Sequence, residues 1–268
     1  MSRSTIIGLT LGFIAVFVGM AVKGASLAIL WNPAAIMIII LGTIACVFIA
    51  FPMTELKKLP KLLKIIFMKP KLTSKQAIIF DMVKIASDAR KEGLLSLENK
   101  LDELSDDFLK YGVQLLVDGN EVQTTRNIMT EEIYAIEGRH HTGAQIFTQA
   151  GTYAPTLGVL GAVVGLIGAL GNLADIDKLG QSIAAAFVAT LLGIFTGYVL
   201  WHPIANKLKA ISRTEVELKT MIVEGITHLG SGVSPVLIEQ YLMSYLSKEE
   251  RQLYARMKGV TDDVETAS

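Results

Sequence analysis

Four long stretches of this chain contain no Asp, Glu, Lys or Arg and consist mostly of apolar residues. A helix needs about 20 such residues to cross the hydrocarbon core of a membrane, which is roughly 30 Å thick. The composition agrees, since 51% of the residues are hydrophobic and only 19% are charged. The sequence therefore predicts an all-α membrane protein with four transmembrane helices, at residues 5–22, 28–51, 146–173 and 179–201.

Basic residues are distributed unevenly around these four stretches. The only Lys or Arg residues in the loops before the second and the fourth stretch are Lys23 and Lys178. Because loops rich in Lys and Arg stay in the cytoplasm, both termini and the large middle loop are expected there. The basic residues behind this prediction are Lys57, Lys58, Lys61, Lys64, Lys69 and Lys71 after the second stretch, and Lys207, Lys209 and Arg213 after the fourth.

The polar regions divide the chain into four parts. Residues 1–52 hold the first two transmembrane helices, and residues 53–145 form a helical cytoplasmic domain inserted between the second and the third. Residues 146–203 hold the third and fourth transmembrane helices as a hairpin, and residues 204–268 form cytoplasmic C-terminal helices and a tail.

The inserted domain is helical throughout. Residues 56–66 place leucines among lysines at helical spacing, which predicts an amphipathic segment near the lipid headgroups, interrupted by Pro60. A helix that ends at Gly93 is followed by another over 96–104. We expect a further helix from near Asn120 to continue toward the third transmembrane helix.

Each helix of the hairpin carries a stripe of very small residues. These residues recur at spacings of three and four, so each set lies on one face of its helix. Small faces let helix backbones approach closely inside lipid. The hairpin is therefore expected to pack tightly against other helices, through Gly158, Gly161, Gly165 and Gly168 on one side and Ala186, Ala189, Gly193 and Gly197 on the other.

No ionisable residue lies inside any predicted transmembrane helix, although proton and ion relays usually contain one. If this protein conducts ions, a partner must supply the titrating carboxylate. The hairpin does contain hydroxyl groups, which bond either to their own helix or to a neighbour. Thr190 lies on the same face as Ala186, Ala189 and Gly193, which favours contact with a neighbouring helix.

Two prolines, Pro155 and Pro203, stand at the cytoplasmic ends of the hairpin. A proline within a membrane helix removes one hydrogen bond and bends the helix locally. Such a bend can act as a hinge or can only shape the packing. Their similar placement in both helices favours a functional role.

The sequence offers no signs of an enzyme. It lacks a Gly-rich phosphate loop, a Cys/His metal spacing and a nucleophile with a base. We interpret His140 and His141 as a solvated or interfacial pair and the single cysteine, Cys46, as a small buried apolar residue. No cofactor, metal or nucleic acid is expected.

Several segments together resemble the MotA family of bacterial flagellar-motor stator proteins, within the MotA/TolQ/ExbB proton channel family. They are RKEGLLSLE at 90–98, MTEEI at 129–133, APTLGVLG at 154–161, and ATLLG at 189–193 leading to Pro203. The resemblance covers nearly the whole chain, and the sequence is similar to those of the Bacillus-like members.

The resemblance implies a multi-pass protein of the bacterial plasma membrane, in contact with lipid, that forms a homo-pentamer around two copies of MotB. The membrane helix of MotB carries an aspartate that binds the coupling ion. Ion flow would rotate the pentameric ring, and the cytoplasmic loop would push on the rotor protein FliG. The resemblance thus accounts for the missing carboxylate.

The resemblance also assigns roles to residues of this chain. Arg90, Glu98 and, with a weaker match, Glu132 correspond to charged residues that contact the rotor. Pro155 and Pro203 correspond to the two prolines that couple ion flow to conformational change, and Thr190 corresponds to the pore threonine of the fourth transmembrane helix. The candidates for lining the pore are Gly158, Ala162, Gly165, Ala186 and Gly193.

One position bears on the coupling ion. Sodium-type relatives have a threonine seven residues after the first hairpin proline, where this chain has Ala162. Fewer hard oxygen ligands favour protons over Na⁺, so proton coupling is expected. The alternatives are a sodium-coupled stator, an energiser of the ExbB or TolQ type, which has three transmembrane helices, and a membrane scaffold or receptor subunit without ion flux.

Overall fold

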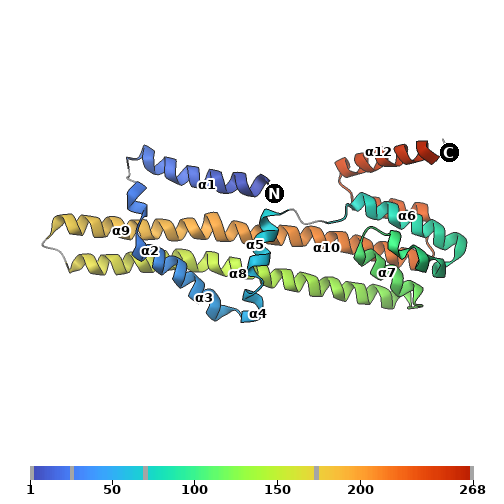
Figure 1. Cartoon of the computed structure of the whole chain (residues 1–268), viewed down its shortest axis with the longest axis horizontal. Helices are drawn as coiled ribbons and strands as arrows, with labels where there is room; N and C mark the ends of the chain where they lie inside the picture. The colour runs from blue at the N-terminus through green and yellow to red at the C-terminus, as the bar shows by residue number, and fades with distance from the viewer. Residues whose placement is uncertain (1–2, 25–26, 69–71, 172–174, 266–268) are drawn as a thin grey trace. The chain divides into compact units, whose positions relative to one another are not determined.

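The computed structural model describes residues 3–24, 27–68, 72–171 and 175–265, and these residues contain helices and no strand. Four helical segments are long and apolar enough to cross a membrane, namely Ser4–Val22, Pro33–Ala50, Val122–Leu170 and Ile176–Gly230. The predicted all-α membrane fold with four transmembrane helices is therefore confirmed (Figure 1). The chain divides into two compact units, described separately below.

The first unit consists of residues 1–70 and 138–212 and contains the apolar helices. The described helices that lie wholly or partly in it are α1 (Arg3–Val22), η1 (Leu27–Leu30), α2 (Pro33–Ile36), the π-helix η2 (Met37–Leu41), α3 (Gly42–Ala50), α4 (Met53–Leu56), α5 (Leu59–Phe67), α8 (Val122–Leu170), α9 (Ile176–Phe195), the π-helix η4 (Thr196–Trp201) and α10 (His202–Gly230). The boundaries between the two units fall inside α8 and α10.

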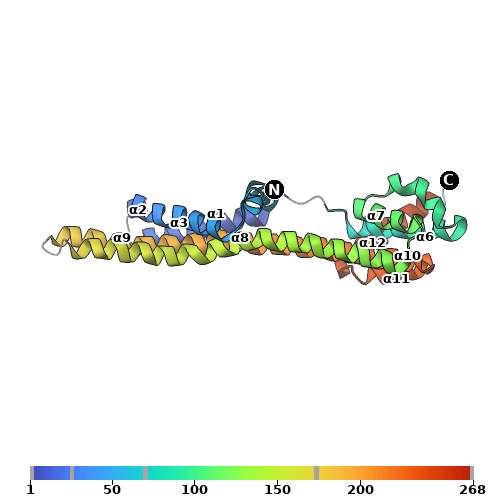
Figure 2. The same cartoon turned by 90° about the horizontal axis from the view of Figure 1, so that it is seen from below.

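Within the first unit, α8 and α9 lie side by side as an antiparallel hairpin (Figures 1 and 2). The amphipathic α5 packs against it, because Ile66 is buried in one cluster with Ala144, Phe147 and Ala205. The predicted interruption of the segment at Pro60 is confirmed, because α4 ends at Leu56 and α5 begins at Leu59. Pro60 stands in the first turn of α5, where no intrahelical partner is needed for its missing N–H.

The second unit consists of residues 71–137 and 213–268. Its own helices are α6 (Lys75–Glu92), the 3₁₀ helix η3 (Leu94–Glu103), α7 (Asp107–Val117), α11 (Pro235–Met243) and α12 (Lys248–Glu265). They pack with parts of α8 and α10 around one apolar core that includes Ile78, Met82, Leu109, Met129 and Met221, each fully buried.

Local signals set the helix ends of the second unit. The Ser74 side chain accepts a hydrogen bond from the N–H of Ala77 and caps α6, which ends at Gly93 with φ of 86°. The next helix, η3, starts at Leu94 rather than at the predicted residue 96, since Gly93 turns the chain and allows a 3₁₀ helix to begin at once. The helix predicted near Asn120 begins at Val122 and does continue through the third apolar stretch.

Candidate functional site

Asp175 starts the second helix of the hairpin. Its Oδ1 accepts a hydrogen bond from the Lys178 N–H at 3.1 Å, and its Oδ2 lies 3.1 Å from Lys178 Nζ. Asp177 stands in the first turn, where a negative charge stabilises the positive end of the helix dipole. The short segment from Asp175 to Lys178 is thus a helix start, while residues 172–174 lie outside the described residues.

The two helices touch backbone to backbone where Gly158 meets Gly193. A Cβ atom on Gly193 would lie 2.8 Å from both the Ala154 carbonyl oxygen and the Gly158 Cα. A Cβ atom on Gly158 would lie 2.9 Å from both the Ala189 carbonyl oxygen and the Gly193 Cα. Only glycine fits at this crossing, because no side chain is present that could move aside.

The small stripes of the two helices face each other along the hairpin. Beyond the crossing, a Cβ on Gly161 would lie 3.4 Å from the Ala189 Cβ, and a Cβ on Gly165 would lie 3.6 Å from the Ala186 Cβ. Gly158, Ala186 and Gly193 are therefore buried within a single chain, whereas Ala162 and Gly165 are partly exposed. Their place in the wall of a pore stays a prediction.

Both predicted hinge prolines lie next to the same helical turn, η4. Pro155 lies inside α8, and its ring atoms Cγ and Cδ would be 2.8 and 2.9 Å from a Cβ on Gly197. Gly197 belongs to the π-helix η4, which ends directly before His202 and Pro203. A π turn contains one extra residue and is a common adjustment next to a proline that cannot donate a hydrogen bond.

A further close contact lies one turn beyond Pro155. A Cβ on Gly151 would meet the His202 ring at 2.8 Å. Gly158 with Gly193, Pro155 with Gly197, and Gly151 with His202 thus form a row of tight contacts. The sequence showed Pro155 and Gly197 as separate features, and it had no signal for the π turn between them.

Threonine hydroxyl groups of the hairpin bond to their own helices. Thr190 donates to the Ala186 carbonyl at 3.3 Å, a longer bond than that from Thr196 to Leu192, at 2.8 Å, or from Thr156 to Tyr153, at 2.7 Å. The long bond of Thr190 is the weakest of the three, so its hydroxyl is the easiest to redirect toward a neighbouring helix.

Asn32 anchors the second transmembrane segment to the hairpin, a role that sequence reasoning missed. Its Oδ1 accepts from the Ala35 N–H at 3.1 Å and caps α2, while its Nδ2 donates to the Ala185 carbonyl of α9 at 3.4 Å. Asn followed by Pro33 is a helix-start signal that could have identified the cap. The contact with α9 has no sequence signal.

The predicted rotor residues lie on the second unit. Arg90, in the last turn of α6, and Glu98, in η3, are both exposed on the corner that Gly93 makes. Neighbouring charges pair with each other, as Lys100 does with Asp88 at 2.9 Å. In contrast, Arg90 and Glu98 form no ion pair with any residue that the structure describes.

Glu132 lies on a different helix, α8, where its side chain is exposed. The structure therefore places Arg90 and Glu98 on one corner and Glu132 on another element of the same unit. The contact of all three with the rotor stays a prediction.

Comparison with known proteins identifies the family. Residues 6–93 match the family model "Motility protein A N-terminal", and residues 100–221 match the MotA/TolQ/ExbB proton channel family. Motility protein A from Bacillus subtilis is 52% identical over 255 residues, which cover 95% of this chain and 94% of that protein. This chain belongs to the Motility protein A family.

Solved structures of MotA-family complexes agree with this assignment. The flagellar MotAB stator complex from Bacillus subtilis matches with a TM-score of 0.87 at 52% identity, over 94% of this chain and 100% of that chain. The C. jejuni MotAB structure matches with a TM-score of 0.86 at 30% identity, over 92% and 97% of the two chains. This MotA-family chain is a multi-pass membrane subunit of a flagellar-motor stator. The stator subunits of this family are not a known enzyme family.

Proposed function

We propose that this stator subunit acts with a MotB-type partner to convert proton flow into torque on the rotor protein FliG. The observation that supports this most strongly is the hairpin itself, whose apolar segments contain no ionisable residue. A proton path across a membrane needs a group that binds and releases the proton. That group is the carboxyl of the partner helix, and the hairpin encloses it.

The choice of proton over Na⁺ is supported by Ala162. This residue is partly exposed on α8 and carries a methyl group, where a hydroxyl could replace part of the hydration shell of Na⁺. No cofactor takes part, since the coupling ion itself binds to the partner.

The glycine and proline contacts support a mechanism for coupling. Binding and release of the proton shift the partner helix against α9, and the turn at Gly197 transmits the shift to α10. Pro155 and Pro203 weaken the hydrogen bonding of both helices near this turn, so a small change can bend them there. Rotation of a homo-pentamer, with both termini in the cytoplasm of the bacterial cell, then carries the exposed corner of α6 and η3 past the rotor.

Co-purification tests the partner assignment. The chain is expressed with its MotB-type partner, purified in detergent, and analysed by native mass spectrometry. We expect a complex of five copies of this chain with two of the partner. A stable complex that contains no helix with a membrane carboxylate contradicts the proposal and supports a scaffold without ion flux.

Thr190 tests the ion path directly. Thr190→Val keeps the side-chain shape and removes only the hydroxyl, so assembly is expected to stay intact while swimming and ion flux are lost. Thr190→Ser keeps the hydroxyl and is expected to retain flux. Flux is measured in vesicles that contain the purified complex. Equal flux in the Val and Ser variants excludes a role for the hydroxyl.

Arg90 tests the rotor contact. Arg90→Glu reverses an unpaired surface charge, so we expect lower torque on a tethered cell without loss of stator assembly. A compensating charge change on the rotor protein should restore torque. Lys91→Glu is the matched control, because Lys91 is also exposed and unpaired among the described residues. If both reversals lower torque equally, the effect is general electrostatics rather than a contact of Arg90.

A further inference from the structure

An apolar pocket lies on the first unit where α1, α5 and the junction of η4 with α10 meet. Its volume is about 390 Å³, within the size range of small-molecule sites. Its wall includes Gly8 and Leu9 of α1, Ile66 and Phe67 of α5, and Pro203 and Ile204 of α10. Most of the lining residues are apolar, which suits an elongated apolar ligand.

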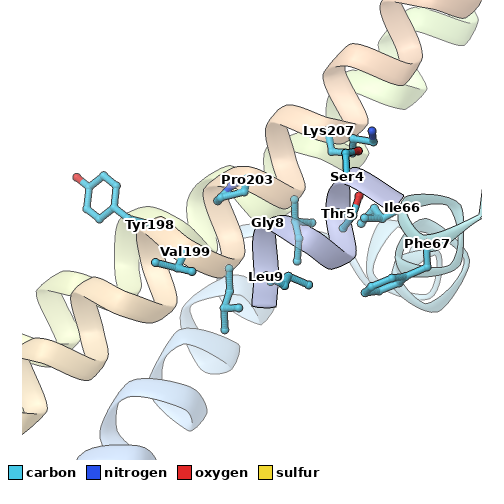
Figure 3. Close-up of a pocket in the computed structure, with 12 residues that line it drawn as sticks. Ser4, Thr5, Gly8, Leu9, Ile66, Phe67, Tyr198, Val199, Pro203 and Lys207 are labelled. Atoms are coloured by element: carbon cyan, nitrogen blue, oxygen red, sulfur yellow. The ribbon is translucent and has the colours of Figure 1, made fainter. Parts of the chain in front are cut away.

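One end of this pocket is positively charged. Lys207 lies there next to the hydroxyl-bearing residues Ser4 and Thr5 (Figure 3). No acidic residue lines the pocket, and Lys207 forms no ion pair with any residue that the structure describes. A ligand with a negative group at one end of an apolar body matches this arrangement.

The three elements that form the pocket are expected at one membrane level. The start of α1, the amphipathic α5 and the end of the fourth transmembrane segment are each predicted at the cytoplasmic face, from the distribution of lysines and arginines. At this level the cytoplasmic leaflet presents anionic headgroups above acyl chains. Basic pockets between membrane helices on this side are typical sites for such lipids.

We propose that this pocket binds an anionic phospholipid of the cytoplasmic leaflet, with its phosphate against Lys207 and one acyl chain along Gly8, Leu9 and Phe67. Pro203 forms part of the wall, so the lipid touches the end of the π turn that Pro155 contacts from the hairpin side. A bound lipid thus packs against this turn on a side that Pro155 does not contact. This site is independent of the identity of the coupling ion.

Native mass spectrometry of the intact complex with its partner tests the site. Phosphatidylglycerol or phosphatidylcholine is added to the delipidated complex, and the lipid retained per chain is measured. The wild type is expected to retain phosphatidylglycerol in preference. Lys207→Gln should weaken phosphatidylglycerol binding about fivefold, the effect of one lysine at a membrane surface, and leave phosphatidylcholine unchanged.

A second variant fills the apolar part of the pocket. A Cβ on Gly8 would meet no atom within 4 Å, so Gly8→Leu adds bulk to the pocket without a backbone clash. It should reduce retention of both lipids. The controls are Gly19→Leu on the same helix, also without an atom within 4 Å, and Lys209→Gln, an exposed lysine outside the pocket. Both should retain lipid as the wild type does.

Three results would overturn the lipid site. One is phosphatidylglycerol retention that is equal in the wild type, Lys207→Gln and Gly8→Leu. Another is competition by free glycerol phosphate as strong as by the whole lipid, which means that only the anion is bound. A third is a photo-crosslink from position 67 to a protein segment in the intact complex rather than to lipid, which means that a helix occupies the pocket.

Discussion

Gly193→Ala is expected to abolish swimming and to destabilise the stator complex. The added Cβ would lie 2.8 Å from the Ala154 carbonyl oxygen and from the Gly158 Cα, and both are backbone atoms. Because backbone cannot rotate away as a side chain can, the two helices must separate. Overpacking of this kind costs about 1–3 kcal/mol or more, and it also opens the contacts on either side. Thermal unfolding of the purified complex and swimming in soft agar measure the two effects.

Another glycine of the same hairpin provides a matched control. A Cβ on Gly180 of α9 would meet no atom within 4 Å. Alanine at this position is therefore expected to leave stability and swimming close to those of the wild type. If Gly193→Ala behaves like this control, the backbone contact with Gly158 does not hold the hairpin together.

Pro155→Ala is expected to abolish swimming by a different route, with the complex still assembled. Alanine restores a backbone N–H inside α8, so the helix regains a hydrogen bond and stiffens where it should bend. It also removes the ring that packs on Gly197 in the π turn. Ion flux in vesicles and torque on tethered cells should both fall, while co-purification with the partner stays unchanged.

Pro60→Ala is the control for the loss of a proline as such. Pro60 lies in the first turn of α5, where a proline breaks no intrahelical hydrogen bond. This variant is expected to swim normally. Loss of assembly in Pro155→Ala, rather than loss of flux alone, would mean that Pro155 only shapes the packing.

The sequence predicts the transmembrane helices well because the bilayer imposes a strong rule on composition. A run of about 20 residues without a charge has few alternatives to a membrane helix. Helix starts can also be predicted from sequence, since a capping side chain such as that of Ser74 acts within its own turn. The interruption at Pro60 could be predicted too, because a proline is tolerated in the first turn of a helix but not in its interior.

Contacts between helices could be predicted only in part. The small residues of the hairpin indicated close packing, but periodicity does not specify a partner, and the structure shows that Gly158 meets Gly193 of the same chain. The contact of Pro155 with Gly197 and the π turn η4 depend on how two distant segments align. The pocket around Lys207 likewise joins three elements that are far apart in the sequence.

The dependence of swimming on the coupling ion tests the central claim most directly. Cells whose only stator contains this chain and its partner are tracked over a range of sodium concentrations, with and without a protonophore. We expect a speed that does not change with sodium and falls to zero when the protonophore collapses the proton gradient. A speed that rises with sodium and persists in the protonophore would contradict a proton path along this hairpin.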